Sequence, residues 1–432
     1  MRQARLTILA AVVLASATAT AAVAATPPTF TNNPAPNGLG TDAGEPSIGT
    51  SFKTGKVMYQ AGLQTLRVDF AASPPTWASV GSTITSTTSL DPILYTEHTT
   101  GRTFVSQLSA GCSLMAFSDD DGASWFQNPI GCGIASGADH QTVGGGPFAP
   151  GLVGPTTSYP KSVYYCAQAI ATAQCALSQN GGLSFNPAVP IYNATQCSGL
   201  HGHIKVAPNG TAYVPNADCG GKQGFAYSTD NGTTWKVTTA PGSSTQDESD
   251  PSVGIGAGNT AYFGYSGSAA NGNESHAMAA IFRNGSWSPS VDVGAALGIK
   301  NVQFPTVVAG DDDRAAFAFL GTTTAGDDQS SSFAGDWHLY VATTYDSGTT
   351  WSTVDATPAD PVQRGCIWLG GGSNQCRNLL DFMDATIDAT GRILVGYADG
   401  CTATCPGGGT NTYTALATIA RQSGGDDLLA AQ

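Results

Sequence analysis

The sequence predicts an all-β fold, a β-propeller of seven blades, with six blades as the alternative. Three observations lead to this prediction: a composition poor in charge, a turn motif that occurs four times, and seven similar strand beginnings. Of 432 residues, 41% are hydrophobic, enough for a large core, and only 11% are charged. With 54 glycines and 24 prolines, the chain suits short strands joined by turns and not a mainly helical fold.

The charge balance narrows the range of partners. The chain carries 17 Lys and Arg against 31 Asp and Glu, a formal net charge of −14. Binding to nucleic acid requires basic side chains that neutralise phosphates, and no basic stripe is present. The composition therefore predicts a protein that does not bind nucleic acid.

The first residues have the pattern of a cleaved secretion signal. Arg2 and Arg5 precede an apolar run over residues 6–23, which ends in small residues. We assign residues 1–25 to this signal, with a retained membrane anchor as the alternative. No later stretch holds 18 consecutive apolar residues, so no membrane span is expected. The pattern predicts a secreted, extracellular protein.

Ten cysteines in an exported chain indicate disulfides. They lie as neighbours along the sequence, so we predict sequential pairing. The predicted pairs are Cys112 with Cys132, Cys166 with Cys175, Cys197 with Cys219, Cys366 with Cys376, and Cys401 with Cys405. Zinc is the weaker alternative, because Cys401 and Cys405 alone have ligand-like spacing and no second such pair exists.

One turn motif, S/T-x-D/N-x-G-x-x-W/F, occurs four times. The copies cover residues 118–125, 178–185, 228–235 and 344–351. The hydroxyl and the carboxylate or amide accept backbone N–H bonds, the glycine takes a positive φ, and the aromatic ring packs beneath the strands. The last interval is twice the others, which predicts a decayed copy near residues 282–287. Another eroded copy is predicted near residues 68–77.

A second element precedes each turn: a polar residue that leads into a short apolar strand. It occurs seven times, at residues 45–48, 91–94, 140–143, 203–206, 250–253, 304–307 and 384–387. Seven units give about 58 residues each, within the range of four-stranded propeller blades. We predict one propeller domain over residues 26–422 and a flexible tail over 423–432. The last unit lacks a fourth strand, which residues near Thr29 are expected to supply.

The four turns resemble the Asp-box, or BNR, repeats of the sialidase-like β-propeller superfamily. The region from Cys366 to Cys401 is similar to secreted bacterial sialidase-like proteins. The resemblance implies that these turns are structural and lie opposite the active site. It also implies a secreted, glycan-active protein, first of all a glycoside hydrolase of the exo-alpha-sialidase-like superfamily. The alternatives are a polysaccharide lyase on uronic-acid glycans and a non-catalytic propeller that binds glycan or protein.

Sialic acid specificity is in doubt on the sequence. Such a site should hold the sugar carboxylate with an arginine cluster. The sequence has no Arg-Ile-Pro motif near its mature N-terminus. Only Arg364 and Arg377 lie in a connection between blades on the expected ligand face.

The candidate site follows from the repeat. If the motif joins the third and fourth strands of a blade, the loops that lead into the first strands lie on the opposite face. The candidate catalytic residues in these loops are Glu45, Asp91, Asp139, His140, His203, Glu248, Asp250, Asp381 and Asp384. The candidate substrate-binding residues are Arg377, His201 and Gln303.

Two chemical roles are open for these residues. In the first, two of them form a catalytic pair, in which one is the acid and the other is the base or nucleophile. Mutual repulsion and burial drive the pKa values of the two apart. Alternatively, each Asp or Glu caps a loop through backbone hydrogen bonds. In a lyase, His140 or His203 would remove a proton while Arg377 or a cation neutralises the substrate carboxylate.

No cofactor or catalytic metal is required by these expectations. Structural calcium is left open, because clusters such as residues 311–313 supply hard oxygen ligands. The expected partner is an extracellular glycan or polysaccharide, and the expected state is a monomer. His98 is interpreted as a solvated turn residue on the face of the repeated turns.

Overall fold

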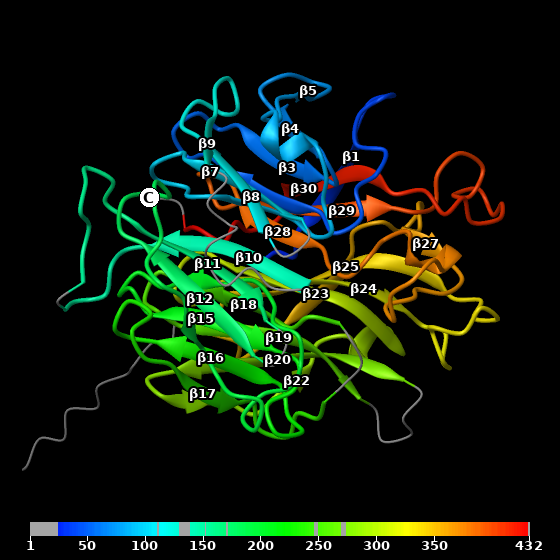
Figure 1. Ribbon diagram of the computed structural model, residues 1–432. Coiled ribbons are helices and arrows are strands. Elements are labelled where there is room, and N and C mark those ends of the chain that lie inside the picture. Colours follow the sequence, from blue (N-terminus) through cyan, green and yellow to red (C-terminus); the bar gives the residue numbers. More distant parts are fainter. Residues whose placement is uncertain are drawn as a thin grey trace, which may run out of the picture.

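Seven antiparallel sheets form a ring in the computed structural model (Figure 1). The structure describes residues 25–109, 112–128, 139–151, 153–169, 172–245, 249–268 and 274–430. The predicted all-β, seven-bladed β-propeller is confirmed. Within those residues, helix is limited to short 3₁₀ turns, and none is long and apolar enough to cross a membrane.

Each blade is built from consecutive strands, numbered here from the channel outward. Blade 1 contains β2 (Ser47–Thr50), β3 (Val57–Ala61), β4 (Gln64–Asp69) and β5 (Thr76–Ser79). Blade 2 contains β6 (Pro92–Thr96), β7 (Thr103–Ser109), β8 (Cys112–Ser118) and β9 (Phe126–Asn128). Blade 3 contains β10 (Asp139–Gly146), β11 (Ser162–Gln168), β12 (Ala173–Ser178) and β13 (Val189–Pro190). Blade 4 contains β14 (Lys205–Val206), β15 (Ala212–Asn216), β16 (Gly224–Ser228) and β17 (Lys236–Thr239).

The remaining blades follow the same order, and two of them carry an extra short strand. Blade 5 contains β18 (Ser252–Ile255), β19 (Ala261–Ser268), β20 (Ser275–Arg283), β21 (Ser286–Trp287) and β22 (Val291–Asp292). Blade 6 contains β23 (Asn301–Ala309), β24 (Ala315–Thr322), β25 (Asp336–Thr344), β26 (Ser352–Asp355) and β27 (Gln363–Arg364). Blade 7 contains β28 (Asp384–Ile387), β29 (Ile393–Asp399), β30 (Leu416–Gly424) and β1 (Thr29–Pro34).

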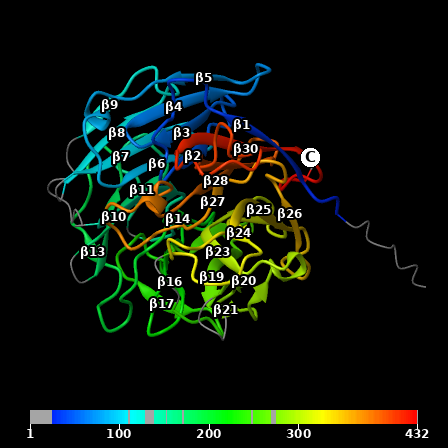
Figure 2. The ribbon, with the colours of Figure 1, turned by 90° about the vertical axis from the view of Figure 1, so that its right-hand side faces the viewer.

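The two ends of the chain meet in blade 7. Strand β1 pairs antiparallel with β30, so the first described strand is the outermost strand of the last blade. Figures 1 and 2 both show the blue β1 beside the red β30. This closure removes an exposed strand edge and confirms the expectation for residues near Thr29.

The chain after residue 422 differs from the flexible tail that the sequence predicted. Strand β30 continues to Gly424, and Leu428 is fully buried. The Leu428 carbonyl accepts the amide of Asp311, and its own amide donates to Gly391. The physical reason is that an apolar side chain in the tail fills the seam between blades 6 and 7.

The four repeated turns share one set of hydrogen bonds. In the first turn, Ser118 Oγ accepts the amide of Gly122, and Asp120 Oδ1 accepts the amide of Ser124, both at 2.8 Å. The equivalent bonds in the other three turns measure 2.8 to 2.9 Å. The turn glycines have φ values of 82°, 92°, 76° and 76°. The chemistry predicted for this motif is therefore present in all four copies.

Inner strands of neighbouring blades approach one another closely. A Cβ atom on Gly49 would lie 2.5 Å from Thr96 Oγ1, and one on Gly254 would lie 2.9 Å from Val307. Glycine permits this approach because it has no side chain. The seven inner strands thereby surround a central channel.

Local disulfides fasten the loops. The structure contains the predicted pairs Cys166–Cys175, Cys197–Cys219, Cys366–Cys376 and Cys401–Cys405. Cys132 lies outside the described residues, so its predicted pairing with Cys112 stays a prediction. Four disulfides are consistent with an extracellular protein.

Candidate functional site

The beginnings of the inner strands meet on the face opposite the repeated turns, here called the loop face. Inner strands run from the loop face toward the turn face, since each repeated turn joins the third and fourth strands. Glu45, Asp91, Asp250 and Asp384 precede or begin β2, β6, β18 and β28, and all four are buried. The side chain of Asp139 and all of Glu248 lie outside the described residues.

Glu45 lies at the centre of an acidic cluster. Burial, followed by repulsion from Asp91 and Asp381, raises its pKa well above the usual 4.5, although His140 acts in the opposite direction. The side chains of Glu45 and Asp381 are also within hydrogen-bonding reach of each other. A buried carboxyl group beside two others holds its proton to higher pH than an exposed glutamate does, which suits a general acid.

Arg377 binds the protein's own carboxylate. Its Nη1 and Nη2 donate to the two oxygens of Asp381 at 2.5 and 2.7 Å, and Nη1 also donates to the Leu369 carbonyl at 2.9 Å. This bidentate geometry fixes the orientation of the Asp381 carboxylate. Arg377, predicted to bind substrate, therefore holds Asp381 in place beside Glu45.

Glu45, His140, Phe304 and Leu380 of this region have an unfavourable backbone conformation, which Asp121, Asn231 and Ser347 of the repeated turns share. Glu45 has φ 54° and His140 has φ 45°, in the left-handed region that residues other than glycine rarely adopt. Such a conformation costs about 1 kcal/mol or more and persists only where surrounding structure imposes it. Strain of this kind is concentrated at functional sites.

His140 pairs with Asp250 and approaches His201. His140 Nδ1 lies 3.3 Å from Asp250 Oδ2, and the rings of His140 and His201 have centroids 6.0 Å apart. Burial, then the charge of His140, lowers the pKa of His201 to about 4, so this imidazole is neutral at pH 7. A carboxylate that orients an imidazole is a common arrangement for a general base.

Two of the predicted catalytic carboxylates cap neighbouring inner strands. Asp91 Oδ2 accepts the amide of Gln141 at 2.6 Å, and Asp384 Oδ2 accepts the amide of Ile48 at 3.3 Å. Each bond links one blade to the next. The structural alternative that the sequence left open thus accounts for one oxygen of each carboxylate.

Two further predicted residues, His203 and Gln303, have partners of their own. His203 packs edge-on against Phe382, with ring centroids 4.5 Å apart, and burial is the main cause that lowers its pKa well below 6.5. Gln303 donates through Nε2 to Asp328 Oδ2 at 2.9 Å. Burial raises the pKa of Asp328 to about 6, making this pair a second protonatable feature of the loop face.

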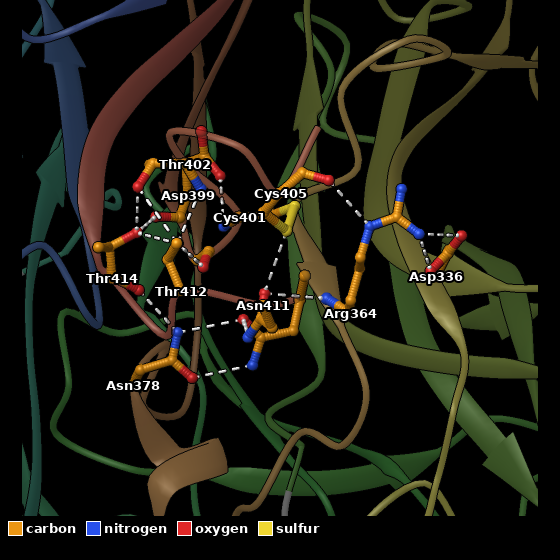
Figure 3. Close-up of a disulfide and its surroundings, with 12 residues drawn as sticks. Asp336, Arg364, Asn378, Asp399, Cys401, Thr402, Cys405, Asn411, Thr412 and Thr414 are labelled. Carbon is orange, nitrogen blue, oxygen red and sulfur yellow. Dashed lines mark hydrogen bonds and ion pairs between the residues drawn. A yellow bond between two sulfur atoms is a disulfide. The ribbon is translucent and has the colours of Figure 1, made fainter. Parts of the chain in front are cut away.

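A second arginine of the loop face is also bound to a carboxylate. Arg364 Nη1 lies 2.7 Å from both carboxylate oxygens of Asp336, and its backbone amide donates to Asn411 (Figure 3). Arg364 Nε donates to the carbonyl of Cys405, within the loop closed by the Cys401–Cys405 disulfide. These contacts tie the long connection before β28 to the loop between β29 and β30.

The interpretation of His98 as a solvated turn residue is wrong. His98 stacks on Phe52, with ring centroids 4.4 Å apart, and its Nε2 lies 3.1 Å from Thr386 Oγ1. Burial lowers its pKa to about 4. The side chain turns inward to the channel, a direction that depends on packing between blades 1, 2 and 7 and not on the local sequence.

The sequence reasoning also missed a cavity of about 440 Å³ in the central channel. Its charged lining residues are Glu97, Lys161, Lys205 and Asp384. Of the predicted site residues that are described, His203 and Asp384 line it. No group of three or more His, Cys, Asp or Glu side chains is arranged to hold a metal ion among the described residues.

No protein-family model matches the sequence, and no curated protein is significantly similar to it. Among solved structures, a GH74 enzyme of Niastella koreensis is 15% identical with a TM-score of 0.52. The match covers 89% of this chain but only 55% of the enzyme.

Two further solved structures are similar over most of this chain. A PL25 ulvan lyase is 10% identical over 88% of this chain and 94% of its own, with a TM-score of 0.47. The Aleuria aurantia lectin is 11% identical over 73% of this chain and 96% of its own, with a TM-score of 0.43. Identities this low show similarity of fold alone. The β-propeller fold is what this chain shares with the GH74 enzyme.

Proposed function

We propose that the protein is a secreted glycoside hydrolase in which Glu45 is the general acid. The observation that carries this proposal is the raised pKa of Glu45, buried beside Asp91 and Asp381. Glycoside hydrolases use one protonated and one ionised carboxyl group on either side of the scissile bond. The repeated turns, which resemble those of the sialidase-like superfamily, and the GH74 neighbour agree with a glycan substrate.

The proposed reaction divides the work between two groups. Glu45 gives its proton to the glycosidic oxygen as the bond to the anomeric carbon breaks. An ionised carboxylate, Asp91 or Asp250, takes a proton from the water that attacks that carbon. The base then releases its proton to solvent, and Glu45 takes up a proton from solvent before the next turnover, which its raised pKa favours.

The proposed substrate is a glycan without a carboxylate at the cleaved residue. Arg377 is bound to Asp381, and Arg364 is bound to Asp336. Recognition of a sialic acid or uronic acid carboxylate needs a guanidinium group that can form a bidentate pair with it. Both arginines that the sequence offered for this role already form such a pair within the protein.

The second candidate function is a polysaccharide lyase, and the His140–Asp250 pair favours it. His140, oriented by Asp250, would remove the proton next to the uronic acid carboxylate, and Glu45 would protonate the leaving oxygen. This reaction needs a group that neutralises the substrate carboxylate. Arg377 is engaged with Asp381, and the described residues include no group arranged to hold a metal ion, so the lyase ranks second.

A panel of neutral and uronic-acid polysaccharides separates the candidates. Hydrolysis produces new reducing ends alone, whereas elimination also produces the ultraviolet absorbance of an unsaturated sugar. We expect reducing ends without that absorbance, and a loss of about 100-fold or more in Glu45→Gln. Asp399→Asn, which also removes a buried carboxyl group of the loop face, is the matched control and should remain active.

Three results would contradict the hydrolase proposal. Growth of the ultraviolet absorbance would establish the lyase instead. Binding to a glycan without either product would establish a non-catalytic binding propeller. Full activity in Glu45→Gln would show that this side chain is not the acid.

A further inference from the structure

The central cavity has the size and lining of a small-molecule site. Residues from all seven inner strands line it, and aliphatic side chains are the largest group among them, including Ile48, Val143, Ile255 and Ile387. Its volume of about 440 Å³ lies within the roughly 300–1,000 Å³ of known ligand pockets. Glu45, Asp91, Asp250 and Asp381 are not part of its lining, so the cavity is separate from the acidic cluster.

Lys205 brings a positive charge into this aliphatic space. It begins β14 in blade 4, and its Nζ lies 3.7 Å from Asp384 Oδ1 of blade 7, so the side chain reaches across the channel. That distance exceeds a hydrogen bond, and among the described residues no acceptor bonds to this ammonium. The Lys205 side chain is 29% exposed, so its three ammonium donors are accessible from the channel.

The other charged groups of the lining have partners within the protein, and its two histidines, His98 and His203, have lowered pKa values. Lys161 pairs with Glu97 at 3.5 Å, and Glu97 also accepts the amide of Thr100. His98 is neutral at pH 7, because burial lowers its pKa to about 4. Asp384 is held by the amide of Ile48. Of the two lining cations, Lys205 has the longer ion pair and the more exposed side chain, 29% against 19% for Lys161, so it is the more accessible to a ligand.

The end of the chain lies at the turn-face end of the cavity. Leu429 lines the cavity, as do Phe52 and Pro208, which follow the inner strands β2 and β14. The neighbouring Leu428 is fully buried and anchors this segment against Gly310 and Gly391. A ligand would thus enter from the turn face, beside Leu429.

We propose that this cavity binds a small amphipathic carboxylate, with the carboxylate on Lys205 and the aliphatic part against the inner strands. The carboxylate would accept hydrogen bonds from the ammonium, and the aliphatic lining would be removed from water. This site is independent of the proposed hydrolysis and lies apart from the acidic cluster.

Isothermal titration calorimetry with octanoate, 1-octanol and octylamine tests the proposal on the full secreted chain. We expect octanoate to bind the most tightly of the three. Lys205→Met should weaken octanoate about tenfold or more, since a hydrogen bond to a charged group is lost, and should leave 1-octanol nearly unchanged. Lys300→Met, a matched change at a surface lysine paired with Glu274, should alter neither.

Ile255→Trp fills the cavity and gives a second test that does not depend on Lys205. It should weaken both octanoate and 1-octanol, with circular dichroism showing an unchanged fold. Equal affinity for octanoate and octylamine, unchanged octanoate binding in Lys205→Met, or binding that survives Ile255→Trp would overturn the proposal. So would the absence of octanoate binding to the folded wild-type protein.

Discussion

The turn face and the loop face both carry acidic residues, and the pKa of Asp120 on the turn face is shifted in the opposite direction from those of Asp328 and Asp399 on the loop face. Hydrogen bonds from Ser124 and Ser118 lower the pKa of Asp120 on the turn face. Burial raises the pKa of Asp328 and Asp399 on the loop face to about 6 and about 7. A turn aspartate is thus fixed in its ionised form by local bonds, whereas loop-face carboxyl groups keep their protons into the range where acid-base chemistry operates.

The difference follows from how each face is built. The four turns repeat one set of bonds within eight residues, so their sequence pattern is nearly constant. The loop face places polar residues at one repeat position, but each has a different partner, often in another blade. A constant sequence pattern therefore indicates residues that maintain the fold. Residues whose partners differ from blade to blade indicate the face where function is to be sought.

The largest expected effect is on the pH dependence of stability, at Asp399. The unfolded chain ionises this carboxyl group near 3.8, but the folded protein holds the proton to about 7. Wild-type stability should therefore fall as pH rises through this window, and Asp399→Asn should not share that fall. Relative to wild type, the variant should gain up to about 4 kcal/mol between roughly pH 4 and pH 8.

Urea unfolding at several pH values measures this gain. Asp346→Asn on the turn face is the control, because hydrogen bonds from Thr350 and Thr344 outweigh burial and lower the pKa of Asp346. Its stability relative to wild type should not rise with pH. If the free energies of unfolding of wild type and Asp399→Asn changed with pH in parallel, Asp399 would not destabilise the folded protein at higher pH, and the two faces would not differ in how pH affects their carboxyl groups.

The next effect concerns activity and separates a catalytic pair from a structural one. Asp250→Asn keeps the shape of the side chain but removes the charge that orients His140. Turnover on the substrate identified by the polysaccharide panel should fall about 100-fold or more, since a general base contributes that order of rate. Chemical unfolding should change by no more than about 1 kcal/mol. Asp120→Asn on the turn face should leave turnover unchanged.

Unchanged turnover combined with lower stability in Asp250→Asn would assign Asp250 to the same structural role that Asp91 and Asp384 fill in part. Asp91 would then be the remaining candidate for the base, and the loop face would be structural at Asp250.

The sequence predicted the fold well because its signals are local. The spacing within residues 118–125 and its three copies is satisfied by bonds inside each turn, and neighbouring cysteines close short loops. The site was predicted only as a set of positions. Contacts between blades decide the role of a side chain at such a position. Asp91 caps the next blade, whereas Glu45 joins an acidic cluster. Lys205 was missed for the same reason, since its partner lies across the channel.

A smaller effect is expected on the turn face itself. Asp230 Oδ1 accepts the amide of Thr234 at 2.9 Å, and Oδ2 accepts its hydroxyl at 2.6 Å. Asp230→Ala removes both bonds and should lower the free energy of unfolding by about 1 to 2 kcal/mol, with activity unchanged. Asn180→Ala at the equivalent position should have a similar cost. A loss of activity without a loss of stability would contradict the structural assignment of this face.

The smallest effect is expected for Asp230→Asn, and the protein contains the precedent. At the equivalent position of the second turn, Asn180 Oδ1 accepts the amide of Ser184 at 2.9 Å, and Nδ2 donates to its hydroxyl at 2.7 Å. An amide thus replaces a carboxylate without loss of either bond, because the hydroxyl reverses its role from donor to acceptor. Urea unfolding of Asp230→Asn at pH 7 should agree with wild type within about 0.5 kcal/mol. A cost as large as that of Asp230→Ala would mean that the charge, and not the hydrogen-bond geometry, holds the turn.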